Sequence, residues 1–463
     1  MAERGWTRRW ALALFALSAA LLGGCGREER PTQKGQGAPE KKEGAPAKEP
    51  GRQFNSKLPF RVLADVDEAQ LSEFVGETPS SQPLAIPSCR RWWVQPLGRP
   101  DMAAVARELD AQKIPGLGLC GNASDDDLVH LKGLKGLQAL NLQNTQVTDA
   151  GLAHLKDSTR LEVLDLGRTR VTDAGLAHLK ELKGLRELSL DGTQVTDAGL
   201  PHLKELKGLR ELSLEGTQVT DAGLAHVKEL RQLQWLDLGH TRVTDNGLAH
   251  LKGLRRLRWL DLWEARVTDA GLVHLKELEG LETLLLGHTQ VTDAGLAHLK
   301  EFKGLRSLAL CGKVRDAGLA HLKELRQLQR LDLEDTAVTD AGLAHLKDLK
   351  GLQTLNLSGT QVLGPGLAHL KDLKGLRRLF LHLTKVTDAS LIHLKELKSL
   401  QWLDLQFTPV TDAGLAHLKE LRELRRLDLC GTNVTEAGGA ELMKWLPKVE
   451  KMSMPARSAE DFR

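Results

Sequence analysis

The sequence predicts an elongated α/β solenoid, and three observations lead to this prediction. One unit of 24 residues recurs along most of the 463-residue chain. Each unit combines two hydrophobic periods: alternate leucines typical of a strand, then leucines at every third position typical of a short helix. Aromatic residues make up only 4% of the chain, and tyrosine is absent. Chain length alone would suggest about two or three compact domains. That estimate assumes compact cores, so it does not apply to a stack of repeated layers.

The charge balance argues against one class of function. The chain has 64 Lys and Arg against 61 Asp and Glu, a net charge of +3. Residues 1–24, with three arginines and one glutamate, supply most of this excess. No block of like charge stands out, which argues against a nucleic-acid partner bound by phosphate neutralisation. Five cysteines are too few for a disulfide-dense scaffold.

Residues 1–24 are predicted to be an export signal. Arg4, Arg8 and Arg9 are followed by a 13-residue apolar run, Trp10 to Leu22, and then by small residues. A membrane-spanning helix needs about 20 residues, so this run is too short to be one. Leu22-Gly23-Gly24-Cys25 resembles the bacterial lipobox, which implies that Cys25 becomes the lipidated first residue of an envelope protein. The alternative is an ordinary signal peptide with an incidental cysteine.

Residues 25–56 are predicted to form a disordered tether. From Gly26 to Arg52, 12 of 27 residues are charged and 9 are Gly or Pro, so the segment cannot bury enough apolar surface to fold. An amino-terminal cap follows at residues 57–113, with a helix expected from Asp101 to Lys113. The segment from Ile114 to Leu119 is predicted to be a degenerate first strand.

The repeat itself is clearest in residues 185–208. Leu188 and Leu190 alternate as in a strand with one buried face, and Leu200, Leu203 and Leu206 form one stripe of a short helix. Thr196 and Asp197 predict the start of that helix. Threonine caps free backbone N–H groups, and aspartate is favourable at the positive end of the helix dipole. Gly199 faces the buried side, where a side chain would push neighbouring units apart.

With its LxxLxLxxTxVTDAGLxHLKxLxx pattern, the unit resembles leucine-rich repeats, particularly cysteine-containing, ribonuclease-inhibitor-like and bacterial VTDAGL repeats. The resemblance implies a right-handed solenoid with a parallel sheet on its concave side and short helices on its convex side. We expect about 13 full turns of 24 residues, a solenoid over residues 114–447 and a carboxy-terminal cap over 448–463. Thr replaces the family's Asn or Cys after the strand, and we expect its hydroxyl to bond backbone groups of adjacent turns.

Several units depart from the pattern. Ala265 replaces the usual Thr, one residue is missing near Cys311–Lys313, and Val362–Gly366 replaces VTDAG. The last unit has Glu441 in place of His, and Val449–Met454 is predicted to be a final strand. Atypical terminal units are expected because the exposed ends of a stack must be covered.

One histidine recurs in each unit: His130, His154, His178, His202, His226, His250, His274, His298, His321, His345, His369, His393 and His417. Metal sites need convergent ligands rather than evenly spaced ones, so no metal is predicted. We expect each ring to pack at the edge of the buried side and to hydrogen-bond to the next turn. Protonation of these histidines would place like charges about 5 Å apart, so we expect their repulsion to make the fold labile in acid.

Candidate binding residues lie where the units differ, on the concave face of the sheet. The first group is Trp235, Asp237, His240, Trp259, Asp261, Trp263, Glu264 and His288. The second is Phe380, His382, Trp402, Asp404 and Phe407. Tryptophan anchors dominate many interfaces, and paired aspartates accept hydrogen bonds from Lys, Arg or sugar hydroxyls. The alternative is that each Trp lies along the sheet and packs on neighbouring turns.

Two charged columns run farther along the same face. Asp165, Asp237, Asp261, Asp332, Asp404 and Asp428 share one strand position, and Arg186, Arg210, Arg258, Arg306, Arg377 and Arg425 lie beside it. Either the two columns neutralise each other or they form a mildly acidic groove for a basic or hydroxylated partner. Cys311 and Cys430 lie about five strand spacings apart, too far for a disulfide, whereas Cys89 and Cys120 could join the cap to the first turns.

Catalytic motifs such as HExxH, GxxxxGK[ST], GxSxG and CxxC are absent from the sequence. We therefore expect neither an enzyme nor a cofactor. The leading hypothesis is a lipid-anchored protein of the bacterial cell envelope that binds a protein or a glycan on its concave face. The first alternative is a structural spacer without a dedicated ligand. The second, a ubiquitin-ligase substrate receptor, rests on the similarity of VTDAGL repeats to those of F-box proteins and conflicts with the export signal.

Overall fold

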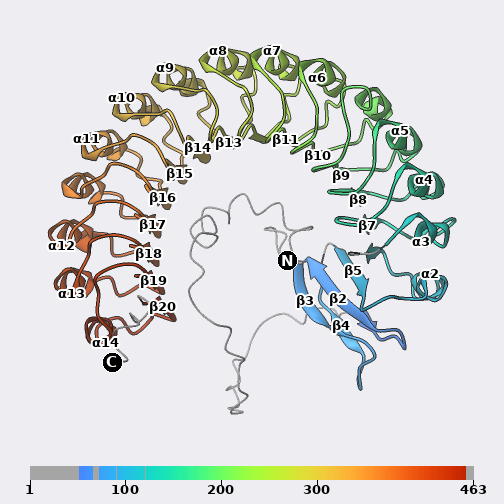
Figure 1. The fold of residues 1–463 in the computed structure, drawn as a ribbon, viewed down its shortest axis with the longest axis horizontal. Helices are drawn as coiled ribbons and strands as arrows, with labels where there is room; N and C mark the ends of the chain where they lie inside the picture. Colours follow the sequence, from blue (N-terminus) through green and yellow to red (C-terminus); the bar gives the residue numbers. More distant parts are fainter. Residues whose placement is uncertain (1–51, 66–71, 90, 120, 122, 455–463) are drawn as a thin grey trace, which may run out of the picture.

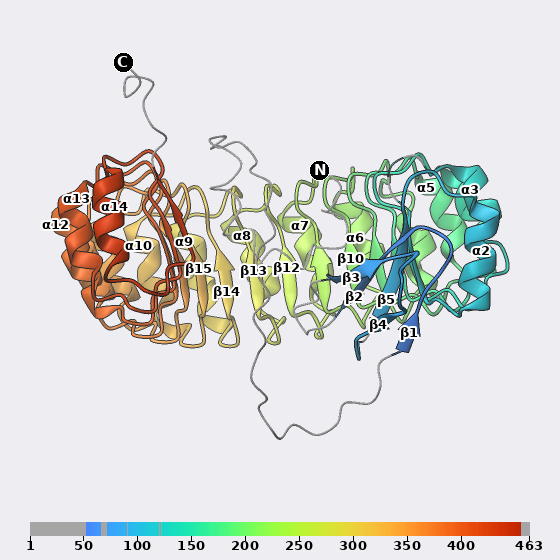
Figure 2. The ribbon, with the colours of Figure 1, turned by 90° about the horizontal axis from the view of Figure 1, so that it is seen from below.

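A computed structural model describes residues 52–65, 72–89, 91–119, 121 and 123–454. The predicted export signal, Cys25, most of the predicted tether and Cys120 lie outside these residues, as does the end of the carboxy-terminal cap. The described chain forms an open arc in which strands line the inner edge and helices the outer edge (Figure 1). Seen edge-on, successive turns lie side by side along a curved band (Figure 2). The predicted solenoid with a parallel concave sheet and convex helices is confirmed.

The inner edge is a parallel sheet in which each strand pairs with the next in the chain. Equivalent leucines face each other in register, as in Leu188↔Leu212 and Leu212↔Leu236, and their side chains are buried. The strands are β6 (Gly116–Gly118), β7 (Ala139–Asn141), β8 (Val163–Asp165), β9 (Glu187–Ser189), β10 (Glu211–Ser213), β11 (Trp235–Asp237), β12 (Trp259–Asp261), β13 (Thr283–Leu285), β14 (Ser307–Ala309), β15 (Arg330–Asp332), β16 (Thr354–Asn356), β17 (Arg378–Phe380), β18 (Trp402–Asp404), β19 (Arg426–Asp428) and β20 (Lys451–Ser453).

The outer edge carries short α-helices. They are α3 (Asp125–Val129), α4 (Asp149–Leu152), α5 (Asp173–Leu176), α6 (Asp221–Val227), α7 (Asp245–Leu248), α8 (Asp269–Leu272), α9 (Asp293–Leu296), α10 (Asp316–Leu319), α11 (Asp340–Leu343), α12 (Asp388–Leu391), α13 (Asp412–Leu415) and α14 (Glu436–Met443).

Most of these helices continue as 3₁₀ helices. These cover Ala153–Leu155, Ala177–Leu179, Ala249–Leu251, Val273–Leu275, Ala297–Glu301, Ala320–Glu324, Ala344–Leu346, Ile392–Glu396 and Ala416–Leu418. Leucines at every third position match the 3₁₀ period of three residues per turn. Two units have only a 3₁₀ helix, Leu200–Glu205 and Pro365–Leu370. Both contain a proline near the start, which lacks the N–H that an α-helical bond requires.

Neighbouring turns are tied together by the Thr-Asp pair at the start of each helix. The carboxylate of Asp197 accepts from the backbone N–H of Thr220 in the next turn (2.7 Å) and from its hydroxyl (2.6 Å). The same hydroxyl caps its own helix by accepting from the Ala222 N–H (3.3 Å). The pair therefore contributes a bond between turns in addition to the predicted capping.

The glycine of each VTDAGL segment makes room for this aspartate. A Cβ at Gly199 would lie 2.5 Å from Oδ1 of Asp173 and 2.9 Å from Cδ1 of Leu176 in the preceding turn. One pair of turns departs from this arrangement. Gly364 replaces the aspartate there, and Ser390 replaces the next turn's glycine; a Cβ at Gly364 would collide with the Ser390 hydroxyl oxygen.

The threonine after each strand does not bond to adjacent turns as we expected. Each hydroxyl donates instead to the carbonyl three residues earlier in its own turn, as Thr193 does to Leu190 at 2.6 Å. The reason is local geometry: the residue before this threonine has a positive φ, as in Gly192, His240 and Phe407, so the chain turns back on itself there. The hydroxyl then closes the turn rather than linking two turns.

The amino-terminal cap extends the sheet. Strand β5 (Arg91–Pro96) pairs with β6, and β2 (Phe60–Asp65) pairs antiparallel with both β5 and β3 (Ser72–Glu77). A separate pair, β1 (Arg52–Phe54) and β4 (Leu84–Ile86), lies beside them, and helix α2 (Met102–Ala111) follows. Phe54 is 2% exposed. The cap therefore includes residues 52–56, which the sequence pattern placed in the tether.

At the other end, α14 and β20 close the stack where a helix and a final strand were expected. Among the residues described here, none of the helices combines the length and the apolar character needed to span a membrane.

Candidate binding surface on the concave sheet

Trp235 and Trp259 form a stacked pair on the concave face. Their strands pair in register, and the ring centroids lie 4.3 Å apart with an interplanar angle of 11°. Both side chains are half-buried. The strand spacing of about 4.8 Å places two such rings in face-to-face contact. We call this pair the tryptophan stack.

Trp263 adopts the alternative arrangement, lying along the sheet. A Cβ at Gly287 would collide with Cζ3 of the Trp263 ring, so the ring covers the next turn where that turn has no side chain. Trp259 and Trp263 also pack on the buried side chains of Leu285 and Ala309. Part of this first group is therefore structural, although all three indoles remain partly exposed.

Carboxylates lie beside the tryptophan stack. Asp237 and Asp261 are in register on neighbouring strands, and each uses Oδ1 to accept a backbone N–H two residues on, from Gly239 (2.8 Å) and Trp263 (2.7 Å). Burial raises the pKa of Asp237 well above its ordinary value. The negative charges of Asp261, Glu215 and Asp191 raise that pKa further, and the hydrogen bond from Gly239 lowers it.

The rim residues of the first group contact each other or a neighbouring tryptophan. His240 Nδ1 lies 3.1 Å from Oε2 of Glu264, and the His288 ring meets Trp263 edge-on with centroids 5.1 Å apart. All three rim residues have positive φ, so they occupy the tight turn that follows each strand. Five units have glycine at this position, a sequence signal from which the turn could have been predicted: Gly192, Gly216, Gly312, Gly359 and Gly431.

The second group is a closed network. The indole N–H of Trp402 donates to Oδ2 of Asp428 (2.8 Å), Nε of Arg426 donates to the same oxygen (2.8 Å), and the Arg426 guanidinium lies 4.1 Å above the Trp402 ring. Phe380 meets Trp402 edge-on at 5.0 Å and is 2% exposed. Arg426 and Asp428, which supply these contacts, were not among the predicted residues of this group.

The remaining members of the second group lie next to this network. His382 is buried, with Nδ1 unpartnered among the described residues, and its ring meets Phe407 edge-on at 5.4 Å. Burial lowers the pKa of His382. Burial also raises the pKa of Asp404 to about 6. Phe407 is 46% exposed, so it is the member of this group most accessible to a partner.

The aspartate column has a structural role. Asp165, Asp332 and Asp404 each accept from the backbone N–H two residues on, as Asp237 and Asp261 do. Members of the arginine column pair elsewhere: Arg258 and Arg306 contact Glu282, and Arg425 contacts Glu450. One carboxylate oxygen of each of these five aspartates is thus engaged by its own turn.

The repeated histidines differ from the prediction. They are exposed or half-buried on the outer edge, and none of the thirteen rings has a hydrogen bond in the described structure. A 3₁₀ helix rotates by about 120° per residue, which carries the ring away from the leucine stripe. No group of His, Cys, Asp and Glu in the described ranges could hold a metal ion. Because the outer edge of an arc is longer than its inner edge, the rings are also spaced more widely than the strands, which weakens the case for acid lability.

The cysteines carry free thiols at Cys89, Cys311 and Cys430. Burial raises the pKa of Cys311 well above its ordinary value, so this thiol is unreactive. Cys120, the suggested partner of Cys89, lies outside the described residues.

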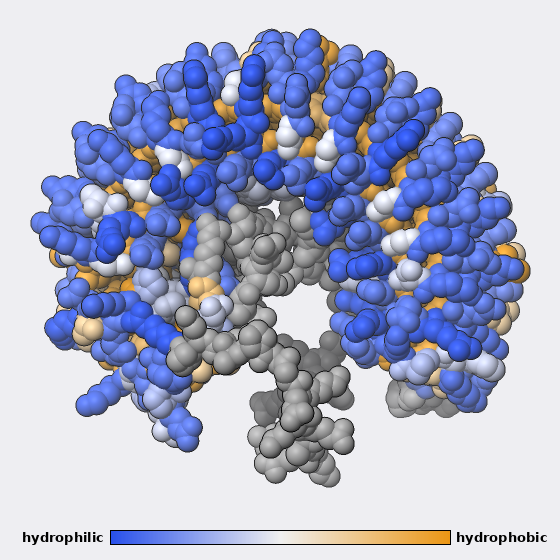
Figure 3. Space-filling model, turned by 180° about the vertical axis from the view of Figure 1, so that it is seen from behind, coloured by the Kyte–Doolittle hydropathy of each residue, from blue (hydrophilic) through white to orange (hydrophobic). Residues whose placement is uncertain are grey.

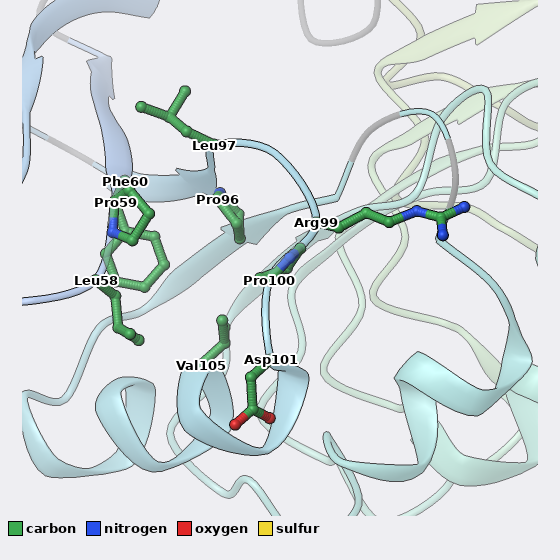
Figure 4. A pocket seen from close by; sticks show the side chains of 9 residues that line it. All are labelled: Leu58, Pro59, Phe60, Pro96, Leu97, Arg99, Pro100, Asp101 and Val105. Atoms are coloured by element: carbon green, nitrogen blue, oxygen red, sulfur yellow. The ribbon is translucent and has the colours of Figure 1, made fainter.

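A small pocket of about 160 Å³ lies between the cap strands and the start of α2 (Figure 4). Its walls include Leu58, Phe60, Leu97 and Val105, and Arg99 and Asp101 lie at its edge. Pockets for small ligands usually enclose about 300–1,000 Å³. Its size and apolar lining make it a packing gap in the cap.

The cap covers the first part of the concave face. Strands β2, β3 and β5 lie inside the arc near its amino-terminal end (Figure 1). Arg91 of β5 forms two hydrogen bonds with Glu187 of β9, of 2.9 and 2.5 Å, and both side chains are nearly buried. The flank seen from behind Figure 1 is mainly hydrophilic, with hydrophobic residues showing between the turns (Figure 3). The cap therefore contacts the concave face at β9, and the tryptophan stack lies farther along the sheet, on β11 and β12.

Comparison with known proteins agrees with this architecture. The family model for a leucine-rich repeat region matches residues 286–456. This part of the solenoid is similar in sequence to leucine-rich repeat regions. Leucine-rich repeat proteins generally act as protein-binding scaffolds and are typically not enzymes. Among curated proteins, none matches the chain in sequence.

Two solved structures are similar to this chain, and one of them is a leucine-rich repeat protein. A leucine-rich repeat protein of Leptospira interrogans is 21% identical with a TM-score of 0.50, and the match covers 76% of this chain and 92% of that one. An internalin of Listeria monocytogenes is 20% identical with a TM-score of 0.48, and the match covers 77% of this chain and 94% of that one.

Proposed function

We propose that this protein is a membrane-tethered scaffold of the bacterial envelope that binds a protein ligand on its concave face, around the tryptophan stack. The observation that carries the proposal is the pair of half-buried, stacked indoles on the concave strands β11 and β12, beyond the cap's contact at β9. Large, rigid aromatic side chains bury much area at low entropic cost, which is why they anchor interfaces. The lipobox-like sequence ending at Cys25 supports the tether.

Photo-crosslinking in the native envelope tests the binding site. A photoreactive phenylalanine analogue at Trp259 should capture a defined protein, whereas the same analogue at His298 on the outer edge should not. The triple substitution Trp235→Ala, Trp259→Ala, Trp263→Ala should abolish capture from a probe at Glu211. Equal capture from both positions would reject the concave site. Recovery of a glycan would show that the ligand is a glycan and not a protein. No capture at all would favour a structural spacer.

Labelling with a radioactive fatty acid tests the tether separately. The wild-type chain should incorporate label, and Cys25→Ser should not. Label that does not depend on Cys25 would contradict lipid anchoring at this residue.

A further inference from the structure

The solenoid collects opposite charges on its two edges. Because the strands are parallel and in register, the loops from helix to strand all lie along one edge of the band, and the loops from strand to helix lie along the other (Figure 2). The seven residues before each of the strands β7 to β19 contain 32 Lys and Arg against 15 Asp and Glu. We call the edge that these loops form the basic edge.

The opposite edge has the reverse balance. Its segments run from the second residue after each of these strands through the VTD aspartate or its equivalent. They contain 7 Lys and Arg against 17 Asp and Glu. The linear sequence does not show this contrast, because most turns add only one or two net charges to an edge. Folding brings together charges that are 24 residues apart.

The basic edge is most positive near the middle of the arc (Figure 1). Residues 252–258 contain four basic residues and no acidic one. Lys228 and Lys252 occupy equivalent positions of adjacent turns, and so do Arg231 and Arg255. Both arginines are exposed, and neither forms an ion pair within the described part of the chain. This section therefore presents uncompensated positive charge to solvent.

Ion pairs between turns use only part of the charge on this edge. A lysine of one turn meets an acid of the next in four places: Lys207–Glu229, Lys350–Asp372, Lys374–Glu396 and Lys398–Glu420. These pairs show that the loops of successive turns lie side by side. Because basic residues outnumber acidic ones about two to one, a positive surplus remains after such pairing.

The segment predicted to be the tether joins the folded part at the basic edge. Gln112 lies in the loop from α2 to β6, which is the first helix-to-strand loop of the stack. Its backbone carbonyl accepts from the guanidinium of Arg52, and its side-chain amide donates to the carbonyl of Asn55 at 2.8 Å. Since Arg52 begins β1, residues 25–51 lead directly to this edge.

We propose that the basic edge lies on a surface of anionic phospholipid headgroups. This inference rests on the lipid tether of the proposed function and gives the solenoid an orientation. The positive loops form one long row along the edge of the band, so a flat anionic surface can meet many of them at once. A folded acidic protein would contact only part of such a row. The concave sheet lies between the two edges, so the membrane would not cover the tryptophan stack.

Co-sedimentation with vesicles tests this assignment. The protein is the chain over residues 25–463 carrying Cys25→Ser, which is the mature form without its lipid. We expect it to bind vesicles of equal parts phosphatidylglycerol and phosphatidylcholine at least about tenfold more tightly than vesicles of phosphatidylcholine alone, and we expect added salt to weaken this binding. Equal binding to the two kinds of vesicle would overturn the inference. Equally tight binding of a DNA duplex at the same phosphate concentration would also overturn it, because the edge would then attract any polyanion.

Two matched variants locate the surface, and each removes four positive charges. The first changes the middle of the basic edge: Lys228→Gln, Arg231→Gln, Lys252→Gln and Arg255→Gln. The second changes the opposite edge: Arg170→Gln, Arg242→Gln, Arg266→Gln and Lys385→Gln. We expect the first variant to bind the anionic vesicles at least about tenfold more weakly and the second less than about threefold more weakly. Equal losses would overturn the assigned edge. Thermal unfolding checks that both variants fold.

The outcomes also separate this inference from the proposed function. If Cys25 incorporates fatty acid but the unlipidated chain does not prefer anionic vesicles, the tether stands and the basic-edge inference fails. If the chain binds anionic vesicles through the basic edge but Cys25 incorporates no label, the membrane surface stands and the proposed lipid tether fails.

Discussion

The two aromatic groups on the concave face are built from the same residue types but are completed differently. In the second group, the Arg426 guanidinium lies over the Trp402 ring, and Asp428 accepts the hydrogen bond of its indole N–H. In the first, the tryptophan stack is bordered by Thr283 and Glu211. The comparison teaches that aromatic residues on an exposed sheet indicate a binding surface only when the chain does not supply their partners. The second group is therefore mainly a stabilising network, and the first is the better candidate for recognition.

The largest expected difference between the groups concerns their aspartates. Asp428→Asn should lower the free energy of unfolding by about 3 kcal/mol, because Asp428 is buried and accepts from Trp402, Arg426 and Ser453. Asp237→Asn keeps an acceptor for Gly239 and removes a charge that its neighbours disfavour, so it should leave stability unchanged or raise it by about 1 kcal/mol. Urea unfolding at pH 7 measures both, and equal losses would remove the distinction.

A smaller contrast is expected for the tryptophans. Trp402→Ala should cost about 2 kcal/mol of stability, because it removes the ring that Phe380 and Arg426 contact. Trp235→Ala should cost about 1 kcal/mol and reduce ligand capture more strongly than Trp402→Ala does. Calorimetry and photo-crosslinking from Glu211 give the two readouts. Greater loss of capture in the Trp402 variant would reverse the assignment of the groups.

The smallest effect is a pH dependence specific to the second group. Burial raises the pKa of Asp404 in the folded chain to about 6, above its value of about 3.9 when unfolded. The folded state therefore binds a proton at Asp404 more tightly than the unfolded state does. The stabilisation from this proton is present at low pH and is lost as pH rises through about 6. Between pH 7.5 and 5, wild type should gain about 1 kcal/mol relative to Asp404→Asn. Comparing the two proteins cancels the titration of the histidines, and parallel curves would contradict the prediction.

The sequence predicts the architecture well because the same pattern of buried leucines recurs in every unit. Leucines at alternate and at third positions specify a buried strand face and the buried stripe of a short helix, and both occur where expected. The 24-residue period also indicates which residues share a column, since neighbouring strands pair in register. The repeat period alone therefore places Trp235 and Trp259 next to each other.

Side-chain partners were harder to predict. The repeat shows which residues are neighbours on adjacent strands, but it does not show towards which group each side chain points. The hydroxyl after each strand turns back to its own carbonyl, and the bond between turns comes from the Thr-Asp pair instead. The histidines were misplaced because an α-helical rotation was assumed for a largely 3₁₀ segment. The contact between Arg91 and Glu187 joins residues 96 positions apart in sequence, and no repeat pattern contains information about it.

The bonds between turns also give the stack a direction. Each aspartate accepts from the turn that follows it, so a stack cut between two turns would present acceptors on one broken face and matching donors on the other. Such faces are complementary but not identical, so they allow head-to-tail association of successive molecules. The strands and helices at the two ends therefore cover these faces and keep one molecule from adding to the next, and removing both caps should lead to end-to-end association.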